Sequence, residues 1–81
     1  MMNANEAKKN VTAYIEAEAT KVIEQIDLNI TKLSKEGRNT FNYYLSNTVR
    51  EDVRVRILAI IEEAGYEVRY SSNARGIYIK W

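Results

Sequence analysis

The residue types that most often perform chemistry are missing from this chain. Its 81 residues include no histidine and no cysteine. Histidine is the commonest general base and metal ligand, and cysteine supplies the thiolate nucleophile, so an enzyme here would have to use other side chains. The adjacent carboxylates Glu62 and Glu63 would point in different directions from a helix. We therefore expect a non-enzymatic protein with no cofactor and no metal site.

The first candidate site is a set of aromatic and basic side chains near the carboxyl end. Three short segments alternate apolar and polar residues, which is typical of strands with one buried face. Their polar face would carry Tyr44, Arg69, Tyr78 and Lys80. Tyrosines can stack on bases and cations can contact phosphates, so this is a candidate nucleic-acid face. The pattern equally fits a solvated face, or a face covered by a neighbouring subunit.

The second candidate site consists of arginines. Arg50 and Arg54 are one helical turn apart, and Arg75 lies in the loop 71–76 between two predicted strands. Together these side chains could bind a carboxylate or a phosphate, and the loop backbone could surround an anion. The simpler interpretation is a set of solvated arginines beside a plain hairpin loop, in which Asn73 and Gly76 supply the turn conformations.

A long amphipathic helix precedes these segments. Residues 3–36 are rich in Ala, Glu, Lys, Ile and Val, and their apolar residues recur at steps of three and four. Asn3 followed by Glu6 resembles a capping box, and Gly37 can adopt the left-handed conformation that ends a helix. The apolar stripe consists of Val11, Ile15, Ala19, Val22, Ile26, Ile30 and Leu33.

The length of this helix predicts self-association through the whole stripe. At 1.5 Å per residue it would extend about 50 Å, whereas residues 37–81 can form a body only about 25 Å across. A monomer would then leave Val11, Ile15 and Ala19 in water, unless the helix frays or bends. The spacing fits a nearly straight bundle, and an alternative heptad register gives a coiled coil with Asn29 in its seam.

The remaining residues predict a small β-α-β-β body. A strand is expected over residues 38–45 and a helix from Thr48, whose hydroxyl would form a capping box with Glu51, to Gly65. A hairpin follows. The fold class is therefore α+β: a long helix over residues 1–36, then residues 37–81 with a three-stranded sheet, in one domain overall. A right-handed crossover would make the first two strands parallel and place the third between them.

Net charge and the lengths of the apolar runs limit which partners and locations the protein can have. The formal net charge is +1, so binding to nucleic acid or lipid would depend on local patches. The longest apolar run, residues 57–61, is far shorter than the roughly 20 residues of a membrane span, and the amino end lacks the apolar core of a signal peptide. We expect a cytoplasmic protein without a membrane partner.

The carboxyl-terminal half resembles small phage-encoded accessory proteins. The resemblance is carried by Glu62-Glu63-Ala64-Gly65-Tyr66-Glu67-Val68 and by the final Ile77-Tyr78-Ile79-Lys80-Trp81, behind a long Lys- and Glu-rich helix. It implies a viral origin and a place in the cytoplasm of a bacterial host cell. Proteins of this class often block a host protein, sequester a small anionic ligand or assist assembly.

These observations favour a self-associating interaction protein. The first helix would form the homo-oligomer, and the partner would be a host protein or a small anionic ligand. The alternative is a nucleic-acid-binding module that uses the open face of the sheet.

Overall fold

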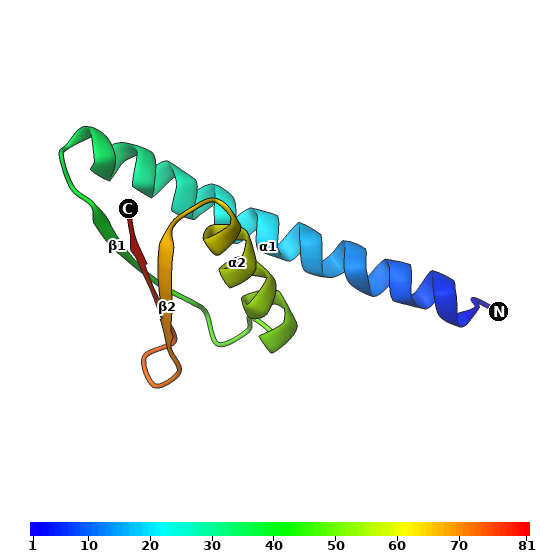
Figure 1. The fold of residues 1–81 in the computed structure, drawn as a ribbon. Helices are drawn as coiled ribbons and strands as arrows, with labels where there is room; N and C mark the ends of the chain where they lie inside the picture. Colours follow the sequence, from blue (N-terminus) through cyan, green and yellow to red (C-terminus); the bar gives the residue numbers. More distant parts are fainter.

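A computed structural model describes residues 1–81 and confirms the α+β fold class. The elements in chain order are α1 (Ala4–Lys35), β1 (Thr40–Tyr44), α2 (Glu51–Glu63), β2 (Glu67–Ser71) and β3 (Gly76–Lys80). Figure 1 shows α1 as one continuous helix that extends well beyond the other elements on its amino-terminal side. The molecule measures 54 × 26 × 17 Å, because a helix of 32 residues lies on a much smaller body.

Both ends of α1 are formed by the residues that the sequence predicts. The side-chain oxygen of Asn3 accepts a hydrogen bond of 2.9 Å from the backbone N–H of Glu6. At the other end Gly37 has φ +81°, and the N–H of Arg38 donates to the carbonyl of Leu33 at 2.9 Å. This left-handed glycine stop satisfies carbonyl groups that the helix would leave unpaired.

The sheet has the strand order β1-β3-β2, and β3 pairs antiparallel with both neighbours. The two edge strands therefore run parallel to each other, as the sequence predicts. Burial alternates along both edge strands, so one face of the sheet is covered and the other is open. The register aligns Phe41, Ile79 and Val68 in one row on the covered face.

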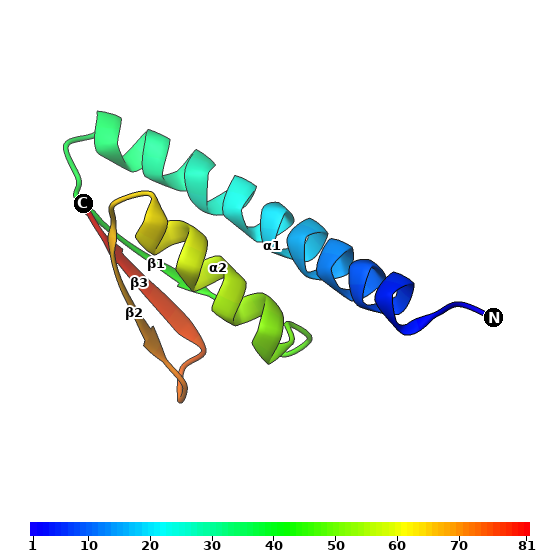
Figure 2. The same ribbon diagram turned by 45° about the vertical axis from the view of Figure 1, so that its right-hand side comes forward.

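Both helices lie on the same side of the sheet, which gives a two-layer structure (Figure 2). The buried side chains come from both helices, from β3 and from the residue after β1, and they form one core, so α1 and the body share a single hydrophobic interior. Its buried members are Ala19, Ile26, Ile30, Leu45, Val53, Ile57, Ile61, Ile77 and Ile79. At the edge of this core the Arg56 Nε lies 2.6 Å from the Glu16 carboxylate, which joins the two helices.

The predicted capping box at Thr48 is wrong. α2 begins at Glu51, and its amino-terminal cap residue is Arg50, which makes no capping hydrogen bond through its side chain. Thr48 belongs to a turn instead: the Val49 N–H donates to the Ser46 carbonyl, and the Ser46 and Thr48 hydroxyl oxygens are 3.0 Å apart. The turn uses the hydroxyl locally, so it is not free to cap the helix.

The expectation that Ala19 would face water in a monomer is also wrong. Its exposed fraction is 0%, and Ile15 is half-buried against the core. The helix α2 runs alongside the middle of α1 and covers this stretch (Figure 2). Only the part of α1 that precedes Ile15 lacks this cover.

No helix in the structure combines the length and the apolar character that crossing a membrane would require.

Ile57 tests the importance of the shared core. The side chain is completely buried, so Ile57→Ala should lower the free energy of unfolding by about 2–5 kcal/mol through lost burial and a residual cavity. The measurement is urea denaturation followed by circular dichroism. Leu28→Ala is the control, because Leu28 is 66% exposed on α1 and its truncation should change stability by less than about 0.5 kcal/mol. Equal effects of the two variants would contradict the described core.

Candidate functional site

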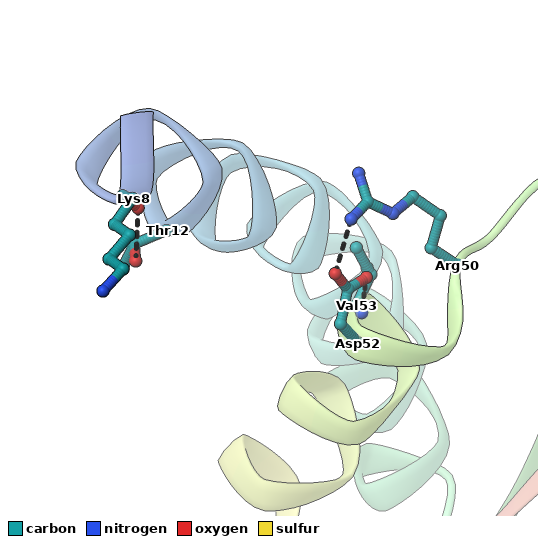
Figure 3. Close-up of polar contacts among 5 residues, drawn as sticks. All are labelled: Lys8, Thr12, Arg50, Asp52 and Val53. Carbon is teal, nitrogen blue, oxygen red and sulfur yellow. Dashed lines mark hydrogen bonds and ion pairs between the residues drawn. The ribbon is translucent and has the colours of Figure 1, made fainter. Parts of the chain in front are cut away.

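The amino-terminal part of α1 is the largest feature without intramolecular cover. Residues 1–14 are all exposed, and Figures 1 and 2 show the helix projecting beyond α2 and the sheet. Apart from Tyr14, whose ring lies 5.1 Å from the Arg50 guanidinium, this segment makes local bonds such as that of the Thr12 hydroxyl to the Lys8 carbonyl at 3.1 Å (Figure 3). Short helices without tertiary packing are of marginal stability in water, so this segment would gain from a partner.

One side of the projecting segment is apolar. Ala4, Ala7, Val11 and Ile15 follow one another at steps of three and four, and we call these four residues the apolar flank. Val11 is 47% exposed, and the neighbouring Tyr14 is 44% exposed. The two alanines are small enough to allow close approach of another helix.

A small hollow continues the apolar flank toward the body. Its volume is about 50 Å³, and it lies between α1 and the turn that precedes α2. Its lining includes Tyr14, Val22, Val49 and Val53, together with the carboxylate-bearing Glu18. Thr48 and Arg50 complete the lining, so the apolar flank leads into a hollow of mixed apolar and polar character.

The seven predicted oligomerisation residues have different environments. Ala19, Ile26 and Ile30 are buried in the chain's own core. Ile15, Val22 and Leu33 are half-buried, which leaves Val11 as the one well-exposed member. Asn29, the candidate seam residue, donates its side-chain amide to the Gln25 carbonyl of the same helix at 2.8 Å. The body therefore covers most of the stripe, and only its amino-terminal end is free for another copy.

The three arginines proposed for anion binding are already engaged within the chain. The Arg50 guanidinium lies 2.6 Å from a carboxylate oxygen of Asp52 (Figure 3). It also lies 5.1 Å from the ring centre of Tyr14. The other Asp52 oxygen accepts the N–H of Val53 at 2.8 Å. Arg54 lies 4.6 Å from the centre of the Tyr70 ring. In these contacts the guanidinium groups of Arg50 and Arg54 interact with other parts of the same chain.

Arg75 has a structural position that the sequence does not predict. It takes the positive φ, +51°, whereas Gly76 begins β3 as an ordinary strand residue. The prediction that Gly76 helps to supply the turn conformation is therefore wrong. One terminal nitrogen of Arg75 donates to the carbonyls of Ser46 and Val49 at 2.9 and 3.2 Å. Through these two hydrogen bonds, which we call the Arg75 clasp, the hairpin loop is joined to the turn before α2.

The predicted nucleic-acid face is assembled by the sheet. Tyr78 on the central strand lies between Asn42 and Arg69, its register partners on the two edge strands. Tyr44 and Tyr78 both line an open hollow of about 200 Å³ on the uncovered face. Lys80 is exposed farther along β3, where its register partner on β2 is Glu67.

The acidic residues do not gather in one place. No three Asp or Glu side chains lie close enough together to hold a metal ion. Glu62 and Glu63 are both exposed near the end of α2. Glu51 and Asp52 lie in the first turn of α2, where carboxylates interact favourably with the helix dipole.

Comparison with models of protein families, with curated proteins and with solved structures finds no match for this chain.

Two features of the candidate surfaces are missing from the sequence-based prediction. Ala4 and Ala7 extend the apolar flank, and their spacing from Val11 is a signal that a wider definition of the stripe would have found. The second feature is Gly76, whose backbone lies under the ring of Tyr44. No pattern in the sequence indicates that pair, because it depends on the register between β1 and β3.

Arg75 provides a test of the clasp. Arg75→Ala removes both hydrogen bonds from a charged donor to backbone carbonyls, so stability should fall by about 1–3 kcal/mol. Chemical denaturation measures this change. Arg69→Ala is the matched control, because that side chain is 76% exposed and its ion pair with Glu67 should contribute less than about 1 kcal/mol. A loss no larger than that of the control would contradict a structural role for Arg75.

Proposed function

We propose that the chain is a non-enzymatic, self-associating interaction protein in which two copies pair through the apolar flank of α1. The observation that carries the proposal is the projection of α1 beyond its body, with Val11 and Tyr14 exposed on it. A second copy would bury this apolar surface and would supply the tertiary contacts that the segment lacks. The absence of histidine and cysteine from the sequence supports a role without catalysis.

Charge favours an antiparallel pair over a parallel pair. Lys8 precedes Val11 by three residues and Glu18 follows Ile15 by three, so both charged residues border the apolar flank. An antiparallel alignment that places Val11 against the partner's Ile15 also brings Lys8 level with the partner's Glu18 along the helix axis. A parallel pair would bring like charges to the same level along the axis, which is less favourable.

The hollow beside α1 supports the same alignment. Matching Val11 with the partner's Ile15 brings the partner's Ala4 toward Val22, which lines the hollow between α1 and the turn before α2. A small side chain suits a space of about 50 Å³. In this arrangement the two bodies lie toward opposite ends of the paired helices.

Pairing would give one particle two copies of the open sheet face. A partner with two matching sites would then bind more tightly than it binds one copy, because the second contact is intramolecular. The sequence favours a host protein or a small anionic ligand as that partner, following the resemblance to phage accessory proteins. The viral origin and the cytoplasmic location stay predictions.

Val11→Asp is the direct test of self-association. A carboxylate at the centre of the pairing surface would be desolvated and unpaired, so this variant should be monomeric at concentrations where the natural chain is a dimer. Native mass spectrometry and sedimentation equilibrium measure the mass. Because Val11 is exposed, circular dichroism should show an unchanged fold.

Leu28→Asp is the matched control for that experiment. Leu28 is the more exposed residue, at 66%, and belongs to the same helix, but it lies outside the apolar flank. This variant should remain dimeric. A natural chain that is monomeric at every accessible concentration would overturn the proposal, and so would equal dissociation of both variants. Ile26→Asp would not be informative, because Ile26 is 2% exposed in the core and the variant would unfold.

Distances between spin labels test the orientation of the pair. The chain has no cysteine, so Ala4→Cys directs one nitroxide to each copy. In the antiparallel alignment the two labels are separated by 18 residues of helix, about 27 Å, whereas a parallel pair brings them to about 10 Å. A second label at Leu28→Cys should give a separation of about 45 Å in the antiparallel pair. Short distances at both positions would contradict the antiparallel arrangement.

A further inference from the structure

The open face of the sheet has an aromatic ring over a glycine at one end of its strands. Gly76 on β3 has no side chain, and its register partners are Tyr44 on β1 and Ser71 on β2. The Tyr44 ring occupies the space above this glycine: a Cβ added to Gly76 would lie 3.1 Å from the ring carbon Cε1. An aromatic ring over a glycine in a neighbouring strand stabilises a sheet by covering its backbone.

The position of Tyr44 also makes it a platform for stacking. One side of the ring lies against the sheet, yet the residue is 66% exposed. Its outer side is therefore available to a planar ligand. Tyr78 lies in the next row of the same face, between Asn42 and Arg69.

These side chains surround the hollow described above. Its volume is about 200 Å³, which is smaller than the usual range for drug-sized ligands and suits one planar group. None of the lining residues carries a carboxylate. The lining consists of Asn42, Tyr44, Arg69, Tyr70, Ser71, Ala74, Gly76 and Tyr78.

The charges around the hollow favour an anionic ligand. Arg69 and Lys80 are exposed on this face and Glu67 is the one carboxylate among them, so two positive charges and one negative charge leave +1. Arg69 is 3.4 Å from the Glu67 carboxylate, and its side chain is 76% exposed. A pair so exposed is weak, and a phosphate could replace the carboxylate at Arg69.

We infer that the open sheet face binds single-stranded nucleic acid, with one base in the hollow beside Tyr44 and Tyr78 and the adjoining phosphates near Arg69 and Lys80. Base stacking on aromatic rings together with backbone contacts to cations is the general mode by which single strands are bound. The bases of a duplex are stacked within the helix and cannot enter the hollow. The site lies entirely within one copy, so this inference does not depend on self-association.

Anisotropy of a fluorescent oligonucleotide of about six nucleotides tests the site, since a strand of this length covers one sheet face. Tyr44→Ala and Tyr78→Ala should each weaken binding by about 5- to 150-fold. Tyr44→Phe keeps the ring and should retain most of the affinity. Val55→Ala is the control, because Val55 is 54% exposed on α2 and lies outside both the hollow and the apolar flank.

Charge variants test the phosphate contacts independently. Arg69→Gln should weaken binding and should reduce the slope of log affinity against log salt by about 0.7, the value for one phosphate contact on a single strand. Lys21→Gln is the matched control, because Lys21 also pairs with a nearby glutamate and its side chain is 71% exposed. Glu67→Gln should strengthen binding, because it removes the one negative charge on the face.

Three results would overturn the inference: absence of binding to any single strand at low salt, equal binding of a duplex of the same sequence, and unchanged affinity of Tyr44→Ala. The monomeric variant Val11→Asp separates the two proposals. It should bind one short strand per chain as tightly as the natural protein does. A dimer that binds no single strand would support self-association and refute the nucleic-acid site.

Discussion

The packing of the second half of α1 against α2 and one face of the sheet is the interaction on which the rest of the structure depends. Ala19, Ile26 and Ile30 enter the same core as Ile57 and Ile79, so neither the long helix nor the body has an interior of its own. Burial of apolar surface is the main favourable term in folding, and a chain of this size buries a smaller fraction of its surface than a larger domain does. Both exposed surfaces discussed above are consequences of this arrangement, because the core uses only half of α1 and only one face of the sheet.

The polar side chains near α2 illustrate how a small fold uses charged groups for its own connections. Arg75 clasps two loops, Arg56 joins the two helices through Glu16, and Arg54 lies on the Tyr70 ring. An arginine can do this because its planar group offers several donors while its carbon chain packs on apolar surface. The anion site suggested by the sequence would have to compete with these contacts, whereas Arg69 on the open face is largely exposed.

The two proposed surfaces are physically separate and have different character. The apolar flank centred on Val11 is a helix side that suits a second copy of the chain, with Lys8 and Glu18 favouring an antiparallel approach. The sheet face centred on Tyr44 is aromatic and slightly basic, and it suits a planar, negatively charged ligand. Because one surface lies on the projecting helix and the other on the sheet side away from both helices, occupation of one need not block the other.

The sequence alone determined the elements, their order and which side of each strand faces the core, since these depend on local periodicity and on glycine stops such as Gly37. The sheet order agrees with a right-handed crossover through α2, but that rule alone does not place β3 between the two edge strands. Three outcomes were decided only by the tertiary structure. The body extends far enough along α1 to bury Ala19, and Arg50 rather than Thr48 is the cap residue of α2. Arg75 is the residue of the hairpin loop that adopts the left-handed conformation. The physical reason is the same in each case. These outcomes depend on contacts between residues distant in sequence, and a contact worth one or two kcal/mol overrides the similarly small preferences of a cap or a turn residue.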